Sequence, residues 1–176
     1  MQEKTLELEC RSRKRNLIIG NLEEERGVNS RESYNQVVAK VVNLFENKLG
    51  ILGAKKMLFR NVHRLGRREA HFTRPRSVIV AFLQQEDVEL VLNAAREMRD
   101  PDISIRTDLP KEYNELRNGL LTIRADYKNR ETNPIRCKLS YIKFKPVLFK
   151  PVPGGDDVIV QVEKDAEGKY REIINV

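Results

Sequence analysis

The chain has 176 residues, of which 40 % are hydrophobic and 34 % are charged. Its 33 Lys and Arg outnumber its 26 Asp and Glu, which gives a net charge of +7 at pH 7. This composition indicates a folded protein of one large or two small domains, and no apolar run approaches the roughly 20 residues of a membrane span. Two cysteines are too few for a disulfide framework or a zinc ribbon, so we expect neither a metal nor a cofactor.

Residues 1–11 are predicted to form a short polar helix whose apolar side chains are Leu6 and Leu8. A helix of this length is marginally stable by itself in water, so we interpret it as the end of a longer coiled coil. Because so few apolar positions remain, we expect the 176 residues to be monomeric at micromolar concentration. A trimer is expected only if a longer coiled coil is present.

Between residues 12 and 109 the hydrophobic pattern switches between the period of strands and that of helices. One helix is predicted to start at a capping box of Asn29 and Glu32 and to stop at Gly50. The other elements are strands at Asn16–Leu22, Met57–Arg64, Ser77–Leu83 and Ile103–Thr107, and a helix at Glu86–Met98. This βαββαβ order is that of a ferredoxin-like domain, with four antiparallel strands and both helices on one face.

A small α+β domain is predicted for residues 110–176. It begins with a helix at Lys111–Arg130 and continues with a strand at Cys137–Phe144. Pro146 and Pro151 frame a further short strand. Val158–Val162 and Tyr170–Ile174 are predicted to form a hairpin around Ala166, Glu167 and Gly168.

Basic residues are clustered along the chain. The segment Lys55–Arg76 contains eight Lys and Arg and one acid, Glu69, and two further clusters lie at Arg11–Arg15 and Lys128–Lys150. Acids collect in Glu86–Asp102 and in the last 21 residues. Such clusters are typical of proteins that bind a polyanion, whereas alternating charges would indicate solvated loops.

Catalysis is not indicated by the sequence. The two histidines, His63 and His71, stand in no nucleophile, zincin or deaminase spacing, and there is no glycine-rich phosphate loop. The acidic loop Glu23–Glu25 could bind a cation, although solvated acidic loops are more common. We therefore expect a binding protein with no enzymatic activity.

Two of the predicted strands resemble the sequence motifs of RNA-recognition domains and point to nucleic acid more specifically than the charge clusters do. LIIGNL, at Leu17–Leu22, matches the shorter ribonucleoprotein motif of RNA-recognition domains except at Ile18, where that motif has a base-stacking aromatic. PRSVIVAF, at Pro75–Phe82, occupies the place of the longer motif, and its two stacking positions are Ser77 and Ile79. Without aromatic stacking, affinity for nucleic acid is expected to come mainly from Lys and Arg contacts to phosphates. Period-two alternation predicts that Val78, Val80 and Phe82 are buried with Leu17 and Ile19, and that Ser77 and Ile79 lie on the other face.

Five segments in the same order resemble the first-open-reading-frame protein of LINE-type retrotransposons. They are SRKRNLIIGNLEE (12–24), FRNVHRLGR (59–67), RPRSVIVAF (74–82) with AAR (94–96), the helix from Lys111, and KLSYI (138–142). The resemblance implies a trimerising coiled coil, a non-standard RNA-recognition domain and a small C-terminal domain that coat single-stranded RNA and act as a nucleic-acid chaperone. Only a vestige of the coiled coil is present here, and the tail after Lys145 departs from the family's helical ending.

The resemblance also implies binding residues, because basic family positions match Arg13, Lys14, Arg64, Arg76, Arg96 and Arg117. Because strand and helix ends place basic side chains around one cleft, these six are expected to line the open sheet face and the groove between the two domains. The full candidate set for binding nucleic acid is Arg13, Lys14, Arg64, Arg67, Arg68, Arg76, Arg96, Arg117, Lys138 and Tyr141. The expected partner is single-stranded RNA, with DNA as the alternative, in ribonucleoprotein particles of the cytoplasm or the nucleus. The alternative function is a protein-interaction or assembly module of the same fold, which the acidic second helix and tail suggest.

Overall fold

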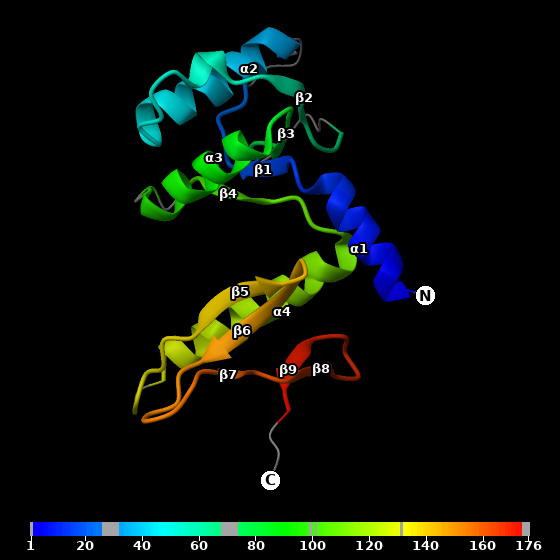
Figure 1. The fold of residues 1–176 in the computed structure, drawn as a ribbon, viewed down its shortest axis with the longest axis vertical. Coiled ribbons are helices and arrows are strands. Elements are labelled where there is room, and N and C mark those ends of the chain that lie inside the picture. Colours follow the sequence, from blue (N-terminus) through cyan, green and yellow to red (C-terminus); the bar gives the residue numbers. More distant parts are fainter. Residues whose placement is uncertain are drawn as a thin grey trace. The chain divides into compact units, whose positions relative to one another are not determined.

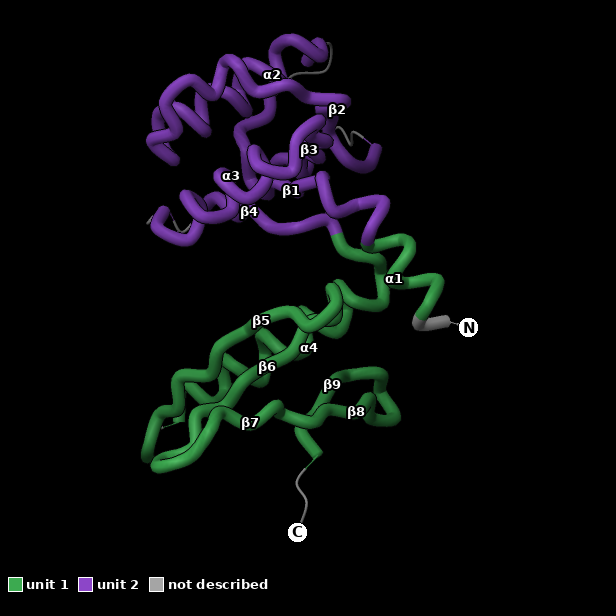
Figure 2. Tube along the Cα trace, in the orientation of Figure 1, with its two compact units in different colours: residues 1–10, 109–176 green, residues 11–108 purple. Residues whose placement is uncertain are grey.

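The structure is a computed structural model, and it describes residues 2–25, 32–67, 74–98, 100, 102–130 and 132–173. It is an α+β protein with antiparallel sheets, as expected from the sequence. The chain divides into two units, residues 11–108 and residues 1–10 with 109–176 (Figure 2). Among the described residues, no helix combines the length and apolar character needed to cross a bilayer.

A four-stranded sheet organises the unit of residues 11–108 (Figure 1). Its strands are β1 (Asn16–Gly20), β2 (Phe59–Arg64), β3 (Val78–Phe82) and β4 (Ser104–Thr107). The spatial order is β2-β3-β1-β4, and every neighbouring pair is antiparallel. Each strand lies within its predicted range and is shorter by one or two residues.

Helices α2 (Tyr34–Asn43) and α3 (Gln85–Glu97) cover one face of this sheet. Leu17 and Ile19 of β1 and Val78, Val80 and Phe82 of β3 form one buried cluster with valines of both helices. This confirms the predicted burial of the five strand residues. A π-helical turn, Leu44–Lys48, extends α2, and a short 3-10 helix, Ala54–Lys56, precedes β2.

Helix α2 begins later than the sequence predicted. Its N-cap is Ser33, whose hydroxyl accepts from the Gln36 N–H (3.3 Å) while the Gln36 side chain accepts from the Ser33 N–H (2.7 Å). The predicted capping box of Asn29 and Glu32 is therefore wrong at Glu32, whose carboxylate is bound by Arg64 and Lys40. Asn29 lies outside the described residues.

The second unit contains helix α4 (Lys111–Lys128), which packs on a sheet of three strands. These are β5 (Lys138–Ile142), β6 (Lys145–Lys150) and β7 (Val158–Ile159), in that order. The β5–β6 turn consists of Lys143 and Phe144, which both have positive φ. The core of this unit joins Leu120 and Tyr127 of α4 to Leu148 of β6.

The tail differs in part from its prediction. Strands β8 (Val162–Lys164) and β9 (Tyr170–Glu172) form a hairpin as expected. Val158 and Ile159 do not belong to it, since they pair with Lys150 and Phe149 of β6. Gly119 of α4 allows β9 to approach, because a Cβ there would lie 2.6 Å from the Tyr170 side chain.

Helix α1 (Gln2–Arg13) is longer than the predicted stub. Leu6 packs against a small cluster of Cys10, Leu109 and Tyr113, which Phe144 also contacts. Leu6 therefore has apolar partners within the chain and does not need a coiled coil to cover it. Leu8 remains 65 % exposed.

Candidate nucleic-acid interface

The excess positive charge belongs to one unit. Residues 11–108 contain 19 Lys and Arg against 13 Asp and Glu, a net charge of +6. The remaining residues, 1–10 and 109–176, contain 14 against 13, a net charge of +1. A polyanion would therefore be attracted mainly to the unit that contains the four-stranded sheet.

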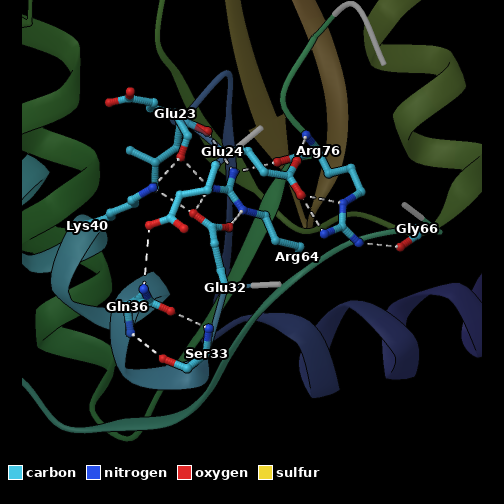
Figure 3. A network of polar contacts seen from close by, with 11 residues as sticks. Glu23, Glu24, Glu32, Ser33, Gln36, Lys40, Arg64, Gly66 and Arg76 are labelled. Atoms are coloured by element: carbon cyan, nitrogen blue, oxygen red, sulfur yellow. Dashed lines mark hydrogen bonds and ion pairs between the residues drawn. The ribbon is translucent and has the colours of Figure 1, made fainter. Parts of the chain in front are cut away.

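Arg64 is one of the predicted binding residues, but all five of its N–H donors are used within the protein (Figure 3). Nε and Nη2 donate to the Glu32 carboxylate at 2.9 and 3.2 Å, and Nη1 donates to the carbonyl oxygens of Leu22 and Arg76 at 2.6 and 2.9 Å. Nη2 also donates to the Glu23 carbonyl. Since the side chain is only 4 % exposed, it has no donor left for a phosphate.

The strand register explains this placement. Val62 and Arg64 of β2 lie opposite Val80 and Val78 of β3, so Arg64 points to the face that the helices cover. There it meets Glu32, just before α2, and Lys40 of that helix donates to the same carboxylate at 2.7 Å. The arginine thus joins the end of β2 to the start of α2.

Arg76 is held by a second carboxylate. Nε and Nη2 donate to Oε1 of the buried Glu24 at 2.9 and 2.5 Å, and the Arg76 backbone N–H donates to its Oε2 at 2.9 Å. Nη1 donates to the Gly66 carbonyl at 3.1 Å. This pair ties the loop after β1 to the segment before β3, and it occupies the Glu24 carboxylate that was considered for a cation. Among the described residues, no cluster of His, Cys, Asp and Glu could hold a metal ion.

The other predicted residues of this unit differ in how accessible they are. Lys14, Arg67 and Arg96 are exposed, and Arg96 donates one hydrogen bond to Asn93 at 2.9 Å. Arg13 is partly exposed and forms an ion pair with Asp108 at 3.2 Å. Arg68 lies outside the described residues.

The predicted residues do not gather at one point of the sheet. The Phe82 N–H donates to the Arg15 carbonyl, so Lys14 lies near the end of β3, whereas Arg64 lies opposite Val78 at its start. These ends are four residues apart, or roughly 13 Å along the strand. The structure thus separates Arg13 and Lys14 from Arg64 and Arg76 within this unit, contrary to the single cleft that we expected.

Arg117, Lys138 and Tyr141 belong to the other unit. Arg117 lies on α4 with its Nε buried and without a hydrogen-bond partner among the described residues. Lys138 and Tyr141 are both exposed on β5, but they are three residues apart and therefore lie on opposite faces of it.

A row of residues crosses the sheet face opposite the helices. His63 pairs with Ile79, Ile79 with Ile18, and Ile18 with Arg106. The row has an aliphatic centre where RNA-recognition motifs have aromatics, and a basic residue next to it. Arg106 was not among the predicted residues. Alternation in ISIRT (103–107) places its side chain on the other face of the sheet from Ile105, so the sequence could have predicted its place in this row.

Acid is expected to weaken the folding of residues 11–108 through Glu24 and Glu32. Burial alone raises the pKa of each carboxyl, but hydrogen bonds and charges from Arg76 (for Glu24) and from Arg64 and Lys40 (for Glu32) outweigh it, so both pKa values lie below the ordinary 4.5. Their stabilisation is complete above the ordinary pKa and is lost as pH falls through the lowered values.

This pH dependence can be measured as the urea midpoint between about pH 6 and 2.5. We expect a steep fall at the acidic end for the parent chain and a shallower fall for Glu32→Gln, which removes one titrating carboxyl. Equal slopes for the two proteins would contradict the assignment to Glu32.

No protein-family model matches the chain, and no curated protein matches it. Its function is therefore inferred from its residues and their geometry.

Proposed function

We propose that this protein binds single-stranded nucleic acid with little sequence preference and acts as a nucleic-acid chaperone in a retrotransposon ribonucleoprotein. In this proposal, residues 11–108 are a ferredoxin-like, non-standard RNA-recognition domain and residues 110–176 a C-terminal domain. The partner is RNA, with DNA as the alternative, and the particle is cytoplasmic or nuclear. The protein performs no catalysis, and it forms a trimer only when a longer coiled coil precedes it.

The observation that carries the proposal is the charge of residues 11–108. The unit has a net charge of +6, and its Arg64 and Arg76, which are paired with Glu32 and Glu24 of the same unit, contribute nothing to that excess. Exposed Lys14, Arg67 and Arg96 are available for phosphates, and the aliphatic Ile18 and Ile79 supply no stacking platform. A surface of this kind neutralises phosphates without reading bases.

Chaperone activity follows from the same chemistry. Lys and Arg contacts lower the repulsion between two strands, which favours their approach. Because the contacts are to phosphates, they do not favour one pairing over another, and each contact can be exchanged without breaking a base-specific bond. Strands can thus re-pair until the most stable duplex forms.

A salt titration tests the proposal. Binding to two single-stranded RNAs of unrelated sequence should weaken in parallel as salt rises, with a slope near −0.7 for each phosphate contact. A duplex of the same length and a single-stranded DNA serve as comparisons. Failure to retain either RNA at about 50 mM salt would contradict the proposal, since phosphate contacts are strongest there.

Placing an aromatic on the sheet is expected to strengthen binding. In Ile79→Phe the new ring would lie between Ile18 and His63, in the row opposite the helices. If the bound nucleic-acid strand crosses this face, base stacking on the new ring should strengthen RNA binding by about 1 kcal/mol or more for any sequence. Filter binding of parent and variant measures the change, and Leu83→Phe, at an exposed position beyond the strand, is the control. If Ile79→Phe does not strengthen RNA binding, the nucleic-acid strand follows a path that does not cross this face of the sheet.

An assembly module of the same fold is the second candidate function. It is favoured by a group of exposed leucines at positions 52, 58 and 90. The two functions are compatible, and loss of RNA binding with retention of a protein partner would favour assembly alone.

A further inference from the structure

A shallow hollow of about 270 Å³ lies in the unit of residues 11–108, and exposed leucines form its rim. Leu52 is 97 % exposed, Leu58 is 56 % exposed and Leu90 is 48 % exposed. Leucine side chains are more stable buried than exposed to water, so three exposed leucines around one depression indicate a surface that another chain covers.

The leucines are held in place by the fold. Gly53 has a φ of 79°, which allows the tight turn that presents Leu52. The Leu83 N–H donates to the Leu58 carbonyl at 3.0 Å and joins the segment before β2 to the start of α3. Ile51 beneath them is buried in the main core. The hollow is thus built on fixed backbone.

Opposite charges flank the hollow. Lys56, beside Lys55, lines it from the short helix before β2, and Asp87, between Glu86 and Glu89, lines it from α3. Lys55 forms an ion pair with Glu46 at 3.4 Å. In the part of the chain that the structure describes, Lys56 and Asp87 form no ion pair. A surface that presents apolar residues together with a basic residue on one element and an acidic residue on another can be complementary to a copy of itself turned by a two-fold rotation.

We propose that this hollow binds a second copy of the same chain. In the resulting symmetric contact, the leucines of the two copies meet at the centre, and Lys56 of each copy faces Asp87 of the other. The contact is small compared with the roughly 1,000 Å² of stable interfaces, so a dissociation constant on the order of 100 µM is expected. This agrees with a monomer at micromolar concentration.

The contact would become effective on nucleic acid, and this extension rests on the proposed function. Two chains bound side by side on one strand are at a high effective concentration, commonly in the millimolar range. A contact that is weak in solution then forms on the strand. Its consequence is pairwise cooperativity, in which a bound chain favours binding of one neighbour, because the two-fold contact is closed once two chains have joined.

The first experiment uses the full chain without nucleic acid. Sedimentation between about 10 and 500 µM, a range that spans the expected constant, should show concentration-dependent dimerisation. Leu52→Ser combined with Leu90→Ser should weaken it at least tenfold. Leu8→Ser, which replaces a leucine that is 65 % exposed outside the hollow, is the matched control and should have no effect.

A charge exchange then tests the two-fold geometry. Lys56→Glu and Asp87→Lys should each abolish dimerisation alone, because like charges then face each other twice. An equimolar mixture of the two variants should restore it, because every facing pair is again of opposite sign. Circular dichroism verifies that both variants are folded.

Three outcomes overturn the proposal. They are a parent chain that stays monomeric throughout, a leucine variant that dimerises like the parent, and a mixture that fails to restore dimers. If the parent chain stays monomeric at all concentrations, the hollow does not bind a second copy, and its partner would have to be a different protein. These outcomes are independent of RNA binding, so loss of RNA binding would remove only the cooperative extension. With RNA, the leucine variant should keep its affinity for a strand that holds one chain and lose cooperativity on longer strands.

Discussion

Replacing Arg64 with Ala is expected to destabilise the unit of residues 11–108 by about 3–5 kcal/mol. The substitution removes five hydrogen bonds and leaves the Glu32 carboxylate with Lys40 as its remaining charged partner. It also leaves the carbonyl oxygens of Leu22, Glu23 and Arg76 without this donor. Buried groups that lose their partner cost more than the partner's contact contributed, so the effect should exceed that of an ordinary surface change. Urea unfolding of the parent and variant measures it.

Two variants make this result specific. Arg67→Ala removes an exposed arginine three residues away and should change stability by no more than about 0.5 kcal/mol. Arg64→Met combined with Glu32→Leu should recover part of the loss, because no charge is then left buried without a partner. If Arg64→Ala unfolds at the same urea concentration as Arg67→Ala, Arg64 is not a structural residue and returns to the candidate phosphate ligands.

The strands could be predicted because the hydrophobic pattern that indicates each one lies within a few consecutive residues. β1 and β3 are apolar runs rich in β-branched residues, and alternation identified the side chains that pack under the helices, although Ile18 and Ala81 on the other face are buried as well. Helix ends were harder, since the N-cap of α2 was decided by a distant contact. Glu32 satisfies the sequence pattern of a capping box, but Arg64 binds its carboxylate, and Ser33 with Gln36 caps the helix instead.

The roles of the arginines could not be read from local sequence. Arg64 and Arg67 belong to the same basic segment, yet within the described residues only Arg64 meets a carboxylate, and that carboxylate is 32 residues away in sequence. Glu24 and Arg76 are 52 residues apart. One signal was available: the acids after β1 follow a strand that runs antiparallel to β3, so they fall at the end of the sheet where β2 stops and β3 starts. Pairing those acids with Arg64 and Arg76 would have identified both bridges.

The tail was less predictable because its strands are short. Val158 and Ile159 satisfy both possible pairings by composition, and their pairing with β6 is fixed by tertiary contacts such as the hydrogen bond from the Val160 N–H to the Leu148 carbonyl (2.8 Å). Leu6 is a similar case, since its partners Leu109 and Tyr113 are about a hundred residues away in sequence.

Replacing Lys14, Arg67 and Arg96 together with Ala is expected to weaken binding to single-stranded RNA by about tenfold to a hundredfold. This range follows from up to about 1 kcal/mol for each exposed charge contact. The slope of log affinity against log salt should become shallower by about 2, at 0.7 for each lost contact. Because the three residues are exposed and the contacts are to phosphates, urea stability and sequence preference should not change.

The matched comparison is Arg76→Ala, which removes one positive charge from the same unit. Arg76 donates to Glu24 and Gly66, so its loss should lower the urea midpoint clearly while RNA affinity falls only as far as the folded fraction does. The two kinds of basic residue would then be distinguished by what their loss changes. Replacing the exposed residues lowers RNA affinity without changing the urea midpoint, whereas replacing the ion-paired Arg76 lowers the urea midpoint. A large loss of RNA affinity in folded Arg76→Ala would place Arg76 among the phosphate ligands despite its ion pair. A loss confined to one RNA sequence would instead indicate base readout and contradict the sequence-tolerant function.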